Sequence, residues 1–159
     1  MSSGEISQST LAPDRDVFIS YSSRDKSTAD AVCSALEAEG VRCWIAPRDI
    51  MSGHEWGESI VGAIRNSKMM VLIFSADSNN SKQVLREVEL AVKNERMLIP
   101  FRIENAAPTG SMEYFLAVPH WLDAMTDPLE KHNQDLLVVV RKVAGDQGTA
   151  PTSDEALEP

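Results

Sequence analysis

The stretch MMVLIF, residues 69–74, consists entirely of apolar residues. Side chains of a β-strand alternate between the two faces of its sheet, so a strand of this composition is buried on both faces. Sheets covered on both faces occur in α/β proteins, where helices connect parallel strands and pack on either side. The stretch therefore predicts a strand of a parallel sheet that lies between two layers of helices.

The segments around this strand continue the alternation of strands and helices, which favours right-handed crossovers between parallel strands. Further strands are predicted at residues 16–21, 41–45, 97–102 and 118–122. The last is placed at an edge of the sheet, since Pro119 has no N–H to donate to a ladder. Helices are predicted over residues 22–40, 52–67, 81–94, 112–116 and 127–143.

Two tryptophans, Trp44 and Trp56, flank the loop between the second strand and the second helix. Ser52 and Glu55 form a capping-box pattern at the predicted start of that helix. Trp56 begins the apolar stripe of the helix, so core packing is predicted for it. Trp44 alternates with Cys43 along the strand and is predicted to be partly buried.

Length, charge and cysteine content narrow the class of protein. A chain of 159 residues suits one domain with a core of its own. Its net charge of −9 argues against binding to a nucleic-acid backbone. A cytoplasmic location is predicted, because no run approaches the roughly 18 apolar residues of a membrane helix and no signal peptide is recognisable. Cys33 and Cys43 lack metal-ligand spacing and are predicted to be buried and reduced, with no metal bound.

The two ends of the chain differ in composition from the segment between them. Residues 1–13 and 145–159 are polar and aperiodic, which predicts a disordered N-terminal arm and a flexible linker or tail. The folded domain is therefore expected over residues 14–144. The composition of the tail is typical of a junction to a further domain, here a sensor or an oligomerising module.

The carboxyl ends of the strands are the expected place for a ligand in such a sheet. Residues 21–24, 45–53 and 75–81 should surround one crevice at this edge. They contain no glycine-rich phosphate loop, no serine-nucleophile elbow and no paired acids of a receiver domain. No pair of histidines has the spacing of metal ligands either. Nucleotide-binding phosphate-loop enzymes, serine hydrolases of the elbow type, receiver domains and histidine-ligated metal enzymes are thereby excluded.

Glu87 is the most informative acid of the third helix. It lies on the flank of the apolar face, with Gln83 one turn before it, and no cation stands three or four residues away. A carboxylate at a core boundary without a local partner can have a raised pKa or meet a ligand. Glu89 points outward and has Lys93 four residues on. Taken alone, a position such as that of Glu87 is more often structural than catalytic.

Four segments in this order resemble a TIR (Toll/interleukin-1 receptor) domain of the bacterial type. They are DVFISYSSRD, CWIAPRDIMSGHEWGESIVGAI, VLIFSADSNNSKQVLREVELA and LIPFRIE, and the likeness extends over about residues 16–143. The resemblance implies an α/β fold, a flavodoxin-like three-layer sandwich whose central parallel sheet has five strands and helices on both faces. It also implies that residues 45–53 correspond to the family's BB loop.

Site residues follow from the same resemblance, position by position. Many TIR domains cleave NAD⁺ at the nicotinamide–ribose bond, with a catalytic glutamate in a pattern like S-x-x-V-x-x-E. Ser81, Val84 and Glu87 fit this pattern, so the resemblance assigns the catalytic role to Glu87. The substrate-binding residues that it implies are Phe18, Tyr21, Ser22, Ser23, Arg24, Arg48, Asp49, Gly53 and Gln83. The family often has Trp at the position of Gln83 in this chain. With Gln83 there, the substrate would not be stacked in the way that is usual in the family.

The implied function is that of an NAD⁺ glycohydrolase of an immune or anti-phage signalling system, activated by self-assembly. NAD⁺ would be the substrate rather than a cofactor, and the product linear or cyclic ADP-ribose. One alternative is a non-catalytic adaptor that binds other TIR domains through residues 45–53. Another is an N-glycosidic enzyme on a related fold, such as a nucleoside deoxyribosyltransferase. Glu87 favours the enzyme over the adaptor, and the pattern of the 45–53 loop disfavours the deoxyribosyltransferase.

Overall fold

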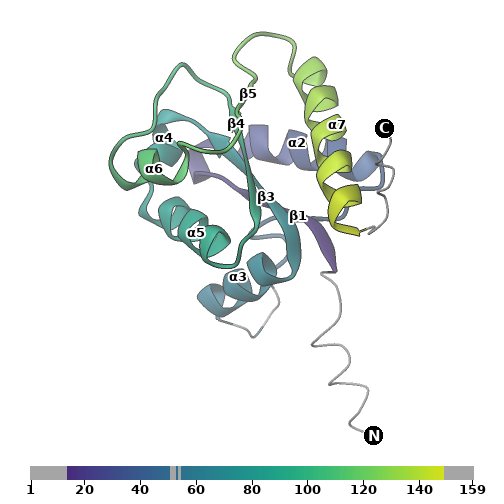
Figure 1. Ribbon diagram of the computed structural model, residues 1–159, viewed down its shortest axis with the longest axis vertical. Helices are drawn as coiled ribbons and strands as arrows, with labels where there is room; N and C mark the ends of the chain where they lie inside the picture. Colours follow the sequence, from purple (N-terminus) through teal and green to yellow (C-terminus); the bar gives the residue numbers. More distant parts are fainter. Residues whose placement is uncertain (1–13, 51–52, 54, 149–159) are drawn as a thin grey trace, which may run out of the picture.

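The computed structural model describes residues 14–50, 53 and 55–148 of the chain. Strands and helices alternate along it (Figure 1). The strands are β1 (Arg15–Ser20), β2 (Cys43–Trp44), β3 (Ser67–Phe74), β4 (Met97–Arg102) and β5 (Leu122–Asp123). The helices are the 3₁₀ turn η1 (Ser23–Asp25), α2 (Lys26–Ala38), α3 (Trp56–Arg65), α4 (Ala76–Asn79), α5 (Lys82–Lys93), α6 (Gly110–Phe115) and α7 (Leu129–Gly148).

The five strands form one parallel sheet in the order β2-β1-β3-β4-β5. This is the flavodoxin-like order, in which the chain reverses direction across the sheet between β1 and β3. The stretch at residues 69–74 lies in β3, which is the central strand and pairs with β1 and β4. The predicted fold class is therefore confirmed.

Alternate residues of β3 enter two separate cores, one on each face of the sheet. Met69, Val71 and Ile73 pack with α2 and α7, whereas Met70, Leu72 and Phe74 pack with α3, α5 and α6. Figure 1 shows the two helical layers with the sheet between them. All six side chains are at most 1 % exposed, as a strand buried on both faces requires.

Serine N-caps fix the starts of the two helical segments that contribute most to the site, η1 with α2 and α5. Ser22 caps η1 by accepting from the N–H of Arg24, and α2 then follows directly. Ser81 caps α5 by accepting from the N–H of Val84 at 3.1 Å. Both predicted helices are confirmed, and both begin at the carboxyl edge of the sheet.

The boundaries of several elements differ from the prediction. β2 has only two residues, and β5 begins at Leu122 rather than before Pro119. α3 begins at Trp56 with Glu55 as its N-cap, so the helix starts later than the capping-box pattern predicted; Ser52 lies outside the described residues. α7 continues to Gly148, past the predicted domain boundary. Sequence patterns are least reliable at the ends of elements, where one or two hydrogen bonds decide the assignment.

None of the described helices combines sufficient length with sufficient apolar content to cross a bilayer.

Candidate functional site

A cavity of about 360 Å³ opens at the carboxyl edge of the sheet beside β1. Its lining comes from the end of β1, η1, the loop after β2, the start of α3 and the start of α5. The cavity therefore lies beside the switch point between β1 and β3, where ligands bind in sheets of this order. Its volume falls at the lower end of the range for small-molecule sites.

Glu87 projects from α5 into this cavity and is only 6 % exposed. The Ser20 hydroxyl at the end of β1 donates to Oε1 of Glu87 at 2.7 Å. The side-chain amide of Gln83 donates to Oε2 at 3.1 Å. Among the described residues, no basic nitrogen lies within ion-pair distance of this carboxyl group. Glu87 is thus held by two neutral donors, one on each oxygen.

Burial raises the pKa of the Glu87 carboxyl above its ordinary value. The hydrogen bonds from Ser20 and Gln83 and the charge of Arg86 lower this pKa, but burial outweighs them. It is also the one charged side chain that is buried within the described ranges. A desolvated carboxylate facing a cavity can stabilise positive charge that develops on a ligand.

One stacked pair of aromatic rings and one hydrogen bond from a tyrosine shape the rest of the cavity. Phe18 stacks on Trp44 with ring centroids 5.1 Å apart and planes 8° from parallel. Tyr21 donates its hydroxyl to the carbonyl oxygen of Ala46, which joins the end of β1 to the loop after β2. Burial raises the pKa of this hydroxyl, so Tyr21 keeps the proton that it donates. The loop is thereby anchored beside Glu87.

Trp56 has a different environment from the one predicted for it. Half of its surface is exposed, at 50 %, and it lines the cavity rather than the core. The prediction of core packing was wrong, because Trp56 is the first residue of α3 and the buried stripe of that helix begins one turn later, at Ile60. An exposed indole at the mouth of a cavity can stack on a flat ligand.

The structure brings six of the ten predicted site residues together around the cavity. These six are Phe18, Tyr21, Ser22, Ser23, Gln83 and Glu87. Arg24 and Gly53 are exposed and do not belong to the lining. Of the described residues of the loop 45–53, only Ala46 and Pro47 line the cavity, so the expectation that Arg48, Asp49 and Gly53 bind the substrate there is corrected.

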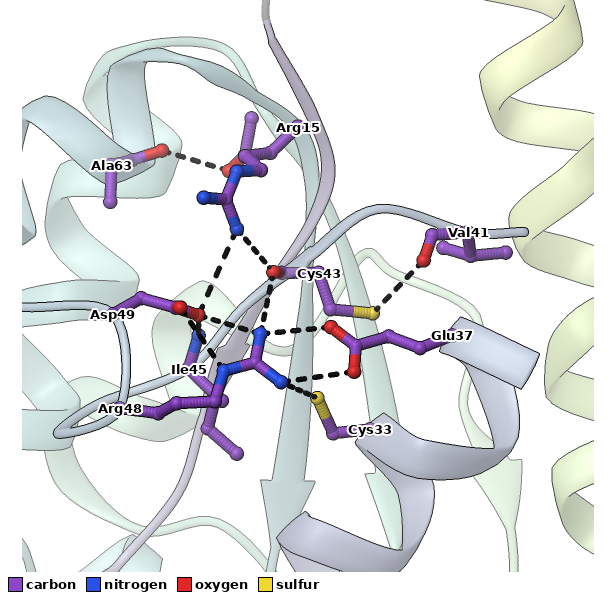
Figure 2. A network of polar contacts seen from close by, with 10 residues as sticks. Arg15, Cys33, Glu37, Val41, Cys43, Ile45, Arg48, Asp49 and Ala63 are labelled. Atoms are coloured by element: carbon purple, nitrogen blue, oxygen red, sulfur yellow. Dashed lines mark hydrogen bonds and ion pairs between the residues drawn. The ribbon is translucent and has the colours of Figure 1, made fainter. Parts of the chain in front are cut away.

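Arg48 and Asp49 also lie outside the lining, in a polar network shown in Figure 2. The Arg48 guanidinium donates to both carboxylate oxygens of Glu37 on α2, at 2.9 and 2.8 Å. It also donates to Asp49 at 3.0 and 2.8 Å. Asp49 in turn accepts from the N–H of Ile45 at 2.9 Å, so both residues fold back onto the strand and helix that precede them.

Besides Trp56, the polar residues Ser20 and Lys26 of the site were missed in the sequence. Ser20 is completely buried and bonded to Glu87, and the signal for it was a hydroxyl at the end of an otherwise apolar strand. Lys26 lines the cavity and is paired with Asp30 at 2.9 Å. Nothing in the local pattern distinguishes Lys26 from other exposed lysines, so only the fold reveals its position.

A second hollow, of about 800 Å³, lies between the ends of α5, β4 and α6. Its acids, Glu95 and Glu113, are both exposed. The smaller cavity is therefore the better candidate for chemistry, since it alone of the two contains a buried carboxyl group.

Comparison with protein families finds one match, to a model described as "TIR domain", over residues 17–138. No curated protein matches the chain. Among solved structures, the TIR domain of the Toll-related receptor TRR-2 from Hydra magnipapillata has a TM-score of 0.68 at 22 % identity, over 80 % of this chain and 98 % of that one.

Two other solved structures share the fold at lower identity. The TIR domains of the activated Roq1 resistosome, which recognises the pathogen effector XopQ, have a TM-score of 0.66 at 16 % identity, over 80 % of this chain and 99 % of that one. BcmB from Clostridium botulinum, a CMP N-glycosidase, has a TM-score of 0.56 at 15 % identity, over 78 % of this chain and 99 % of that one.

Proposed function

The chain belongs to the TIR domain family, and from that premise we propose that it is an NAD⁺ glycohydrolase that releases nicotinamide. One observation supports this proposal above all others. A glutamate that fits the family's catalytic pattern, Glu87, is a buried carboxyl group facing a cavity at the switch point of the sheet. Its two hydrogen bonds come from neutral groups, and none of the basic side chains that the structure describes lies at ion-pair distance from it.

The proposed reaction breaks the bond between ribose C1′ and the nicotinamide nitrogen of NAD⁺. The bonding electron pair goes to that nitrogen, so nicotinamide leaves as a neutral molecule without a general acid. Positive charge builds on the ribose, as in the oxocarbenium-like transition state of glycoside hydrolysis. The Glu87 carboxylate stabilises this charge and accepts hydrogen bonds from ribose hydroxyls. Water then adds to C1′ and loses a proton, which yields ADP-ribose; an internal nucleophile would instead yield a cyclic product.

The lining of the cavity fits the nicotinamide–ribose half of this substrate. The ribose would lie against Glu87, and the flat nicotinamide ring against aromatic side chains at the cavity wall. Lys26, at the rim, is placed to attract the phosphates of the other half. In this arrangement Trp56 supplies the stacking surface that the family often obtains from a tryptophan at the position of Gln83.

Substitution of Trp56 tests this arrangement. In Trp56→Ala we expect KM for NAD⁺ to rise about fivefold, because the loss of one aromatic contact costs about 1 kcal/mol. Trp56→Phe, which keeps an aromatic ring, should recover most of this loss. Steady-state kinetics of nicotinamide release measures both. An unchanged KM in Trp56→Ala would show that the substrate does not stack there.

Self-assembly is proposed as the control of this activity, in the cytoplasm and within an immune or anti-phage signalling system. The loop 45–53 supports this part, since Ala46 and Pro47 line the cavity while Arg48 joins the loop to Glu37 on α2. A neighbouring subunit that contacts the loop would therefore also act on the cavity wall. The similar TIR domains of Roq1 were solved within an activated resistosome.

A second candidate is favoured by one comparison, the shared fold with a CMP N-glycosidase. Both reactions break an N-glycosidic bond, but cytosine, unlike nicotinamide in NAD⁺, carries no positive charge to discharge. The test incubates concentrated or scaffolded protein with NAD⁺ or CMP and separates the products by chromatography. Nicotinamide from NAD⁺ supports the proposal, cytosine from CMP supports the second candidate, and neither product would leave the adaptor function.

A further inference from the structure

The fold brings the two cysteines of the chain to one place beside α2. Cys33 lies on α2 and Cys43 on β2, and both are free and buried. Glu37 follows Cys33 by one helical turn, so its carboxylate lies over the same side of the helix. The two sulfur atoms and a carboxylate oxygen all lie within 4.8 Å of one another. Figure 2 shows this cluster beside Arg48.

We propose that Cys33, Glu37 and Cys43 form a binding site for a divalent transition-metal ion of the Zn²⁺ type. Two thiolates and one carboxylate are ligands that Zn²⁺ and Cd²⁺ accept, and water would complete a tetrahedron. Bonds of about 2.3 Å to sulfur in a tetrahedron place ligand atoms roughly 3.8 Å apart. The three atoms therefore need to close by about 1 Å at most, which side-chain rotations of Glu37 and small shifts of α2 can supply.

Arg48 is the group that a metal ion would displace. Its guanidinium holds both carboxylate oxygens of Glu37 and lies 3.8 Å from Sγ of Cys33. A carboxylate oxygen that binds the metal can no longer accept from Arg48 in the same geometry. Arg48 would retain its bonds to Asp49, which belong to the loop. Metal binding would thus loosen the attachment of the loop 45–53 to α2.

The charges permit this exchange. Each thiol would release its proton to solvent on binding, because the metal binds the thiolate. Two thiolates, one carboxylate and a divalent ion carry a net charge of −1, which the neighbouring Arg48 can still balance. The Cys43 thiol donates to the carbonyl oxygen of Val41 at 3.9 Å, and it would lose this bond when its sulfur binds the metal as a thiolate. The site does not rest on the proposed NAD⁺ cleavage and can exist without it.

The test titrates the reduced, purified chain with Cd²⁺ and with Zn²⁺. Because the chain contains only these two cysteines, an ultraviolet thiolate-to-cadmium charge-transfer band reports this site alone. We expect the band to saturate at one Cd²⁺ per chain and calorimetry to give one Zn²⁺ per chain. Absence of the band, or saturation that leaves the thiols reactive to a maleimide, would overturn the proposal.

Glu37, the proposed metal ligand, and Arg48, which competes with the metal for Glu37, are both exposed, so each can be substituted without disturbing the core. Glu37→Gln removes a ligand and should weaken Zn²⁺ binding by about tenfold or more. Arg48→Ala frees Glu37 and should tighten binding. The matched control is Glu39→Gln, a neighbouring acid that pairs instead with Arg141, and its affinity should equal that of the wild type. Equal affinities in Glu37→Gln and Glu39→Gln, or weaker binding in Arg48→Ala, would contradict the assignment.

Discussion

Glu87→Gln is expected to lower the rate of nicotinamide release from NAD⁺ by about 10²–10³-fold. The amide has nearly the same shape as the carboxylate and can still accept from Ser20. It carries no charge, however, so it cannot offset the positive charge that forms on the ribose. The effect should fall on kcat more than on KM, because the lost interaction is strongest in the transition state.

Glu89→Gln is the matched control for this substitution. Glu89 lies on the same helix two residues later, but it is exposed and lines neither the cavity nor the core. Its replacement should leave the rate within about twofold of the wild type, since surface substitutions change little. Equal losses in the two variants would mean that the charge of the helix, rather than a fixed carboxylate, controls the reaction.

The stability of Glu87→Gln should change in the opposite direction to its activity. Burial raises the pKa of Glu87 in the folded chain above the ordinary value it has when unfolded. The folded state therefore binds more protons, and stability falls as pH rises from the unfolded pKa through the folded one. At neutral pH we expect Glu87→Gln to be more stable by roughly 0.5–2 kcal/mol. Urea unfolding should show this gain disappear below about pH 4.

Trp44→Ala is expected to lower the free energy of unfolding by about 3–5 kcal/mol, the largest stability loss predicted for this site. Trp44 is 7 % exposed and stacks on Phe18, which is 2 % exposed and lines the cavity. Its removal would leave a void beneath the cavity and deprive Phe18 of its partner. Chemical denaturation followed by circular dichroism measures the loss.

Trp56→Ala provides the control, because it removes the same side chain from an exposed position. We expect it to cost less than about 1 kcal/mol of stability, since half of the indole already contacts solvent. Similar losses in Trp44→Ala and Trp56→Ala would contradict the positions of both tryptophans in the structure.

Much of the fold could be predicted because its signals are local and strong. β3 follows from an uninterrupted apolar run, and α5 from a capping serine with an apolar face behind it. The position of Glu87 on the flank of that face predicted a carboxyl group near the core, and the structure places it there, 6 % exposed. Its catalytic role rested on the family resemblance and remains a proposal.

The remaining features depend on contacts between segments that are distant in the sequence. Helical periodicity places Trp56 on the apolar face, but α3 starts at this residue and its buried stripe begins only at Ile60. Arg48 could not be separated from the site by spacing, because its partner Glu37 comes from the preceding helix. Asp49 pairs with Arg48 and stays with it outside the lining. The same applies to Cys33 and Cys43, whose separation resembles no metal motif until α2 packs against β2.

The most direct test of the account is the rate of nicotinamide release from NAD⁺ at rising protein concentration and on an assembling scaffold. Release by the wild-type chain should rise faster than its concentration, with ADP-ribose or its cyclic form as the second product. Glu87→Gln should release nicotinamide about 10²–10³-fold more slowly than the wild type when both are assembled. Equal release by the assembled wild-type chain and assembled Glu87→Gln would contradict the claim that the Glu87 carboxylate promotes cleavage of the glycosidic bond.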